Sequence, residues 1–342
     1  MSKVYTALVT PFKEADRSID YNSLNSILKS QLDAGITGGL FFGSTGEGRT
    51  ITYGEKLNLL SHVLSIRNYY KSSDVPFKHI LSDKWTQDQL EKLSAQMKIL
   101  NYQIIVGVGG DCTEETIKFA KQCKKIGCDQ IMVTVPAYNK PNQTGIYEHF
   151  KAIAIAVQNE THEIIEKKVD GDIDKELLSE DEKNKTITGM PILMYNIPSR
   201  TGANMCATTI AKLRKEFPHI YGIKEASGSI DKVWEIMSLC DIDIFAGDDT
   251  MYIPVTAMGG CGVVSVLSNV LPDVMVAIRD KGSKKFHFDV YHKVKTMFCD
   301  TNPIAVKYAM AKKGIISSDT LRLPLTKLQE DKQKIVDSAF DF

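Results

Sequence analysis

Short runs of β-branched and other apolar residues recur along the chain, and a longer amphipathic stretch separates each run from the next. Runs of this length suit buried strands, and the stretches between them suit helices that cover a parallel sheet. Strands and helices that alternate in this way build an α/β fold, and eight strands close a barrel. The eight candidate strands are Tyr5–Val9, Gly39–Phe42, Ile104–Val106, Gln130–Thr134, Ile192–Tyr195, Tyr221–Ile223, Ile242–Phe245 and Gly262–Ser265.

We therefore expect a (β/α)8 TIM barrel over residues 1–285 and a small C-terminal helical segment over residues 286–342. The candidate helices include Tyr21–Asp33, Thr113–Lys124, Gly145–Val157 and Ala207–Lys215. Two segments interrupt the alternation, near residues 71–102, with an extra amphipathic stretch, and near residues 158–190, which are rich in charge. Each lies between a helix and the next strand, so both insertions are expected on the N-terminal face of the barrel, away from the active site.

Most candidate strands run directly into a loop rich in Gly, Pro, Ser, Thr or Asn. These loops read GSTGEG, GVGGD, PAYNKP, NIPSRTG, KEASG and AGDD. In a TIM barrel the loops that follow the strands meet at the C-terminal face, where the active sites of this fold lie. We therefore expect the functional residues in these loops and at the strand ends.

Composition excludes some partners. Lys and Arg together number 42 and so do Asp and Glu, so no net charge attracts nucleic acid or an anionic membrane. The sequence contains no apolar run of 18 residues and no targeting pattern, which favours a cytoplasmic protein. The seven cysteines are scattered without a zinc pattern, so we expect reduced and mostly buried thiols, and no metal.

Lys224 directly follows an apolar candidate strand and precedes a turn. A lysine at such a strand end points into a pocket, where the loss of hydration lowers its pKa and frees the amine to attack a ketone. The alternatives are a lysine that extends to solvent or one that pairs with Glu225. Taken alone, this position does not separate these possibilities.

Tyr195 ends the preceding candidate strand, so its phenol could share a pocket with Lys224 and carry protons. Arg200, in the loop beyond, has the forked geometry that suits a substrate carboxylate. A core tyrosine and a surface arginine are the alternatives. The neighbouring carboxylates Asp248 and Asp249 resemble a metal or glycosidase pair, but here they are expected to organise the loop after the seventh strand.

The loop from Gly43 to Gly48 combines glycines, which leave backbone N–H groups exposed, with the hydroxyls of Ser44 and Thr45. Such a loop can bind the carboxylate of an α-keto acid. It lacks the Gly-Lys-Ser/Thr of a P-loop and the GxGxxG of a dinucleotide fold.

An ordered set of longer motifs gives a specific resemblance. TALVTPF, GSTGE, PxYNKP, YNIPSRTG, IKEASG, AGDD, NPIAVKYAM and LRLPL follow the order and approximate spacing of dihydrodipicolinate synthases. These enzymes belong to the class I aldolase superfamily that includes N-acetylneuraminate lyase. The resemblance covers nearly the whole chain apart from the two insertions.

The resemblance implies a role for residues at matching positions. Lys224 matches the Schiff-base lysine, and Tyr195 matches the tyrosine that relays protons. Ser44 takes the place of the threonine whose hydroxyl links two tyrosines, and Tyr138 matches the tyrosine that a neighbouring subunit contributes.

The same resemblance assigns the substrate contacts. Thr45 falls at the position that binds the pyruvate carboxylate, and Arg200 matches the arginine that receives the carboxylate of the aldehyde. Gly247 and Val264 match positions in the pocket wall. The implied reaction condenses pyruvate with L-aspartate 4-semialdehyde through an imine on Lys224, without a cofactor or metal. The implied assembly is a homotetramer, a dimer of dimers.

Two departures from the family pattern concern specificity and regulation. The string with Ser44 is also common in N-acetylneuraminate lyases, so that activity, or that of another keto-sugar-acid aldolase, stays open beside the synthase. A catalytically silent relative is a further alternative, although the site residues are all present. At the site where many relatives bind lysine, Ala137 replaces an aromatic residue and Lys56 brings a positive charge. Tyr53, Asp111 and the retained Glu115 belong to the same set, and we expect weak or no inhibition by lysine.

Overall fold

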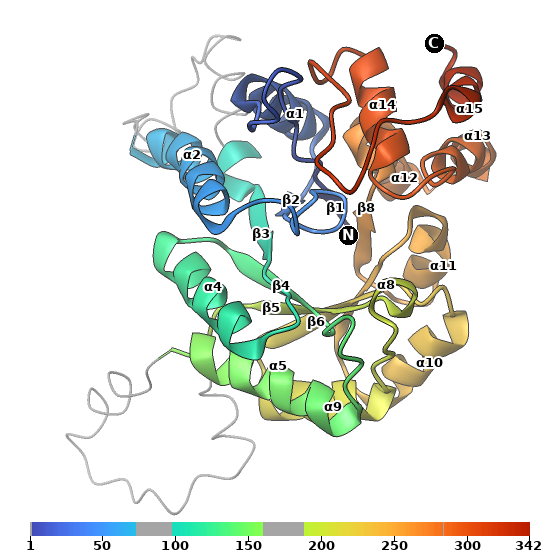
Figure 1. Cartoon of the computed structure of the whole chain (residues 1–342). Coiled ribbons are helices and arrows are strands. Elements are labelled where there is room, and N and C mark those ends of the chain that lie inside the picture. The colour runs from blue at the N-terminus through green and yellow to red at the C-terminus, as the bar shows by residue number, and fades with distance from the viewer. Residues whose placement is uncertain (1, 73–97, 160–187, 283) are drawn as a thin grey trace, which may run out of the picture. The chain divides into compact units, whose positions relative to one another are not determined.

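The computed structural model of the chain describes residues 2–72, 98–159, 188–282 and 284–342. Its eight strands form a closed barrel in the order of the sequence, which confirms the predicted fold class (Figure 1). The strands are β1 Lys3–Ala7, β2 Gly38–Phe41, β3 Gln103–Gly107, β4 Gln130–Thr134, β5 Ile192–Asn196, β6 Ile220–Glu225, β7 Asp243–Ala246 and β8 Gly262–Ser265.

Every predicted strand overlaps an observed one, but their ends differ by up to two residues. The first strand begins and ends two residues earlier than predicted, and β6 continues two residues beyond Ile223. Lys224 is therefore the last but one residue of β6 and does not follow the strand. The reason is the ladder with β7, in which Lys224 pairs with Phe245 and Glu225 with Ala246.

The helices lie between and after the strands. They are α1 Tyr21–Ala34, α2 Tyr53–Ser72, α4 Thr113–Ile126, α5 Gln143–Val157, α8 Pro198–Thr201, α9 Ala207–Glu216, α10 Ile230–Leu239, α11 Tyr252–Ala257, α12 Pro272–Lys281, α13 Lys284–Thr296, α14 Ile304–Lys312 and α15 Glu330–Phe340. Single-turn helices are η2 Asp249–Met251 and η3 Leu267–Asn269. No helix in the described ranges is long and apolar enough to cross a bilayer.

The described chain forms two compact units. One comprises residues 1–104 and 263–342, where β1 pairs in parallel with β2, α12 packs on α1, and α13 and α14 pack on α15 (Figure 1). The other comprises residues 105–262, where β3 to β7 form a continuous parallel ladder and α4, α5, α9 and α10 pack side by side in that order. The domain boundary expected at residue 285 stays a prediction.

Local sequence explains several of these ends. The Asp20 carboxylate accepts hydrogen bonds from the backbone N–H groups of Asn22 and Ser23 and so begins α1. Gly35, with a φ of 81°, ends the same helix in the left-handed conformation that glycine adopts easily. The two predicted insertions, including the stretch at Gln87–Leu100, fall mainly on residues 73–97 and 160–187 and so lie outside the described residues.

The expectation for the cysteines was partly wrong. All seven are free thiols, but of these only Cys123 and Cys128 are buried. Cys112 and Cys206 are exposed because each occupies the first position before a helix, at a loop on the surface.

Candidate functional site

Lys224 and Tyr195 lie next to each other on neighbouring strands. Parallel pairing of β5 with β6 sets the two residues opposite one another. The Nζ atom of Lys224 lies 4.3 Å from the centroid of the Tyr195 ring, and each residue is only 5 % exposed. An amine in contact with the face of a phenol is a pair that both proton transfer and imine chemistry can use.

Burial governs the state of the Lys224 amine. The loss of hydration lowers its pKa from an ordinary lysine value to about 8, because the charged form loses more than the neutral one. The carboxylates of Asp248 and Asp249 act against this shift, and the Arg200 guanidinium adds to it. A substantial fraction of the amine is therefore unprotonated and nucleophilic near neutral pH.

Glu225 does not pair with Lys224, which removes that alternative. Its carboxylate accepts hydrogen bonds from the side-chain amide of Asn196, at 2.9 Å, and from the backbone N–H of Ser227, at 2.6 Å. Both Glu225 and Asn196 are buried and directly follow Lys224 and Tyr195. Successive residues of a strand point to opposite faces of the sheet. The hydrogen bond between Asn196 and Glu225 therefore joins β5 to β6 on the face opposite to Lys224 and Tyr195.

Asn196 also holds the segment beyond Arg200. Its amide donates to the Oδ1 atom of Asn204 at 2.9 Å and accepts from the backbone N–H of Met205 at 3.0 Å. Sequence reasoning missed Asn196, although the alternation of strand faces places it behind Tyr195. The residue that follows each candidate at a strand end points to the opposite face of the sheet, and this alternation could have indicated Asn196 from the sequence.

Arg200 lies on α8, a single turn that ends at Gly202 with a φ of 68°. Its side chain is exposed, and its charge lowers the pKa values of Lys224 and Asp248. Burial raises the pKa of Asp248, while the positive charges of Lys224 and Arg200 oppose that rise. These three charges therefore form one interacting group at the C-terminal ends of β5, β6 and β7.

Tyr138 does not join the buried pair. It is 90 % exposed, in the loop after β4, with a φ of 59°. The backbone N–H of Asn139 donates to the carbonyl of Ala137 across it, which forms a γ-turn. Asp111 holds this turn, because its carboxylate accepts from the Ala137 N–H at 3.2 Å and its carbonyl from the Asn139 side chain at 3.1 Å.

Gly247 follows β7 and leaves no room for a side chain. Its N–H donates to the carbonyl of Glu225 at 2.8 Å, which brings its backbone against the end of β6. A Cβ atom here would lie 2.3 Å from the Cβ atom of Ala226. Glycine is therefore required for the close approach of the two strand ends.

The other predicted residues lie in the first unit. Thr45 is 2 % exposed, and its hydroxyl accepts a hydrogen bond of 2.9 Å from the side-chain amide of Asn302. Ser44 is half-buried in the same loop, and Val264 is fully buried in β8. Asn302 was not predicted as a site residue, although it begins the family motif NPIAVKYAM, because the motif does not indicate a contact with a loop so distant in the chain.

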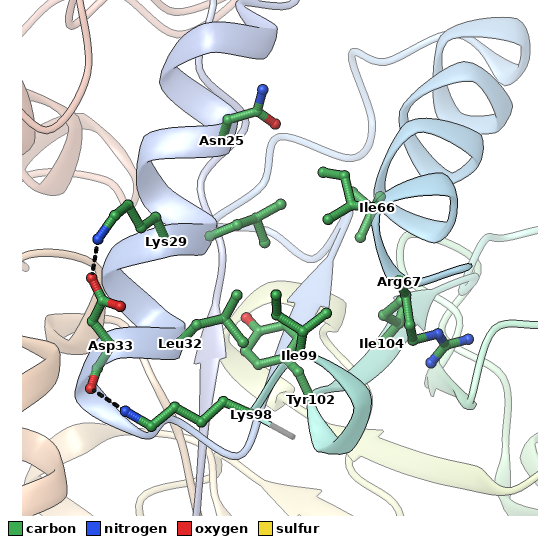
Figure 2. A pocket seen from close by; sticks show the side chains of 12 residues that line it. Asn25, Lys29, Leu32, Asp33, Ile66, Arg67, Lys98, Ile99, Tyr102 and Ile104 are labelled. Carbon is green, nitrogen blue, oxygen red and sulfur yellow. Dashed lines mark hydrogen bonds and ion pairs between the residues drawn. The ribbon is translucent and has the colours of Figure 1, made fainter. Parts of the chain in front are cut away.

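A hollow of about 420 Å³ lies elsewhere in the first unit, among α1, α2 and the start of β3 (Figure 2). Aliphatic side chains such as Leu32 and Ile99 line it, and Lys29 and Lys98 bind the carboxylate and the carbonyl of Asp33 at one rim. It contains none of the predicted site residues and adjoins the N-terminal end of β3, not a C-terminal strand end. No cluster of three His, Cys, Asp or Glu side chains that could hold a metal occurs among the residues that the structure describes.

Comparison with known proteins identifies relatives along most of the chain. The model of the dihydrodipicolinate synthetase family matches residues 1–69, 86–164 and 184–341. The two internal stretches that it leaves unmatched, residues 70–85 and 165–183, coincide with parts of the two segments expected as insertions. The 4-hydroxy-tetrahydrodipicolinate synthase of Endomicrobium trichonymphae is 33 % identical over 99 % of this chain and 97 % of its own length.

Solved structures agree in fold. The 4-hydroxy-tetrahydrodipicolinate synthase of Methylacidiphilum fumariolicum SolV superimposes with a TM-score of 0.75 at 29 % identity and covers 100 % of this chain and 95 % of that one. The dihydrodipicolinate synthase of Cyanidioschyzon merolae, solved with lysine bound, has a TM-score of 0.74 at 27 % identity, with 99 % and 97 % coverage. With its barrel, its strand-borne lysine and a family match along most of its length, this chain belongs to the dihydrodipicolinate synthetase family.

Proposed function

We propose that the chain is a 4-hydroxy-tetrahydrodipicolinate synthase, a lyase that condenses pyruvate with L-aspartate 4-semialdehyde in lysine and diaminopimelate biosynthesis. The observation that carries this proposal is the buried Lys224 amine, with a pKa lowered to about 8, in contact with Tyr195. The similarity to synthases over nearly the whole chain supports the same substrates.

The first half of the reaction forms and activates an imine. The neutral Lys224 amine attacks the keto carbon of pyruvate, and the carbinolamine loses water to give the imine. Tyr195 carries the proton that the departing hydroxyl needs. The positive imine then acidifies the adjacent methyl group, which loses a proton to give an enamine. No metal or diffusible cofactor takes part in these steps.

The second half joins the two substrates. The enamine carbon attacks the aldehyde carbon of the semialdehyde, whose carboxylate binds Arg200. The amino group of the new adduct then attacks the imine carbon, closes the ring and displaces Lys224. Thr45 binds the carboxylate of pyruvate, Ser44 links the relay tyrosines, and Gly247 and Val264 form the pocket wall.

The assay compares two reactions with the same protein. We expect consumption of pyruvate with L-aspartate 4-semialdehyde, abolished in Lys224→Ala and unchanged in Lys29→Ala, which alters an exposed lysine on α1. Release of pyruvate from N-acetylneuraminate alone would assign the chain to the lyase branch, the alternative that the Ser44 loop keeps open. A catalytically silent protein would form no imine with pyruvate that cyanoborohydride could trap.

The proposed assembly is a cytoplasmic homotetramer in which Tyr138 enters the active site of a neighbouring subunit. Its exposure and its fixed γ-turn support this role, because an exposed aromatic ring on a braced turn is available to a partner. Activity should therefore fall when dilution dissociates the protein, as sedimentation would record. A monodisperse and fully active monomer would contradict the proposal.

Inhibition by lysine should be weak or absent, although a relative was solved with lysine bound. The reasons are Ala137, which offers no aromatic wall to the ligand, and the positive charge of Lys56. An inhibition constant for lysine below about 1 mM, measured in the coupled assay, would contradict this expectation.

A further inference from the structure

The loop that carries Ser44 and Thr45 has an unusual anchor. Glu47 adopts a φ of 50°, a conformation that residues with a side chain rarely take, and its carboxylate is buried. One oxygen accepts from the Nζ atom of Lys307 at 2.5 Å, and the other accepts from the backbone N–H of Arg322 at 3.0 Å. The loop is therefore held through a side chain that points away from solvent.

Lys307, on α14, is completely buried and has several partners besides Glu47. Its Nζ atom donates to the carbonyl of Thr320 at 2.9 Å and lies 4.1 Å from the centroid of the Phe12 ring. A fully buried ion pair contributes little net stability, because both charges lose their hydration. What such a pair does provide is a defined position for the groups attached to it.

Asn302 holds the same loop at a second point and sets the direction of a proton. Its side-chain N–H donates to the Thr45 hydroxyl oxygen. A hydroxyl group that accepts at its oxygen retains its own hydrogen as a donor. Thr45 can then donate that hydrogen to an anion such as a carboxylate.

We propose that Asn302 and Lys307 are positioning residues for pyruvate: Asn302 orients the Thr45 hydroxyl as a donor to the carboxylate, and Lys307 holds the loop through Glu47. This inference rests on the proposed function. Both residues belong to the C-terminal segment, at residues 302–322, that also supplies the backbone N–H of Arg322. The segment after the barrel thereby determines affinity for the first substrate.

Two variants test the inference, one at each of the two points that hold the loop. Asn302→Asp replaces the donor by an acceptor, which would draw the Thr45 hydrogen away from pyruvate. The double variant Glu47→Gln with Lys307→Met removes both charges and keeps similar side-chain volumes. A double variant is needed because Lys307→Met by itself would leave the buried Glu47 carboxylate without its partner and could prevent folding. The matched control is Lys332→Met on α15, which breaks the more exposed ion pair between Lys332 and Asp300.

The measurement is cyanoborohydride trapping with pyruvate or with its methyl ester, which lacks the carboxylate, and without the aldehyde. Both test variants should need about ten- to a hundredfold more pyruvate for half-maximal trapping, the loss expected for one hydrogen bond to a charged group. Half-saturation by the methyl ester and the maximal rate should change little. The control should behave as wild type.

The outcomes separate the two proposals. Unchanged half-saturation by pyruvate, or equal changes for both ketones, would overturn the positioning role while the wild type is still trapped. A wild type that pyruvate does not trap at all would overturn the proposed function itself.

Discussion

The pKa of Lys224 makes a quantitative prediction for imine formation. With a pKa of about 8, about a tenth of the amine is neutral at pH 7. An ordinary lysine would be neutral to only about 0.03 %, so burial raises the reactive fraction about 300-fold. The initial rate of cyanoborohydride trapping with pyruvate should therefore rise with pH and level off above about 8.

Two charge changes should move this profile in opposite directions. Asp248→Asn removes a carboxylate that stabilises the ammonium, so the inflection should fall, and the rate at pH 7 can rise by at most about tenfold. Arg200→Gln removes a positive charge and should raise the inflection; the aldehyde, its proposed ligand, is absent from this half-reaction. Asp241→Asn removes one negative charge, as Asp248→Asn does, but at an exposed site, and it should not move the inflection.

The result that would refute the reasoning is specific. A wild-type inflection near 10 would mean that burial does not lower the pKa of the amine. A shift of both variants in the same direction would mean that Asp248 and Arg200 do not act on Lys224 through their charges.

Three further predictions concern stability and the strand ends. Burial lowers the pKa of His149 to about 4, so its contribution to stability is complete above about pH 6.5 and decreases as the pH falls. The free energy of unfolding should drop by about 2 kcal/mol between pH 6.5 and 5, and His149→Gln should flatten this slope in denaturant titrations. Gly247→Ala should destabilise by about 1–3 kcal/mol and abolish trapping, because its Cβ atom would lie 2.3 Å from a neighbouring side chain, whereas Gly54→Ala has open space and should be neutral or stabilising in thermal melts. Asn196→Ala should slow imine trapping about tenfold without moving its inflection, and retention of the wild-type rate would show that this amide does not position Lys224.

The sequence predicted the barrel because its strands are short, β-branched and separated by amphipathic stretches. It also predicted that Tyr195 and Lys224 lie close together, because consecutive parallel strands bring equivalent positions side by side. The ends of the strands were less certain, since apolar character stops at Ile223 while the backbone ladder continues through Glu225.

Other features depend on contacts that no local pattern encodes. Asn302 reaches Thr45 across 257 positions, and the family motif NPIAVKYAM that it begins does not indicate this partner. The positive φ of Tyr138 is equally hidden, because tyrosine normally avoids that conformation and Asp111 stabilises it from another loop. Such features follow from tertiary structure and could not be derived from propensities.

The hydrogen bonds of Asn196 have a consequence for how this enzyme could acquire new substrates. One amide connects the glutamate behind Lys224 to the segment that follows Arg200. Selection for a different aldehyde would act on that segment. Through Asn196, each accepted substitution there would also alter the position of the Lys224 amine. We therefore expect epistasis: variants with altered aldehyde preference should carry compensating substitutions at Asn196, Asn204 or Glu225, far more often than at positions on the exposed helix surfaces.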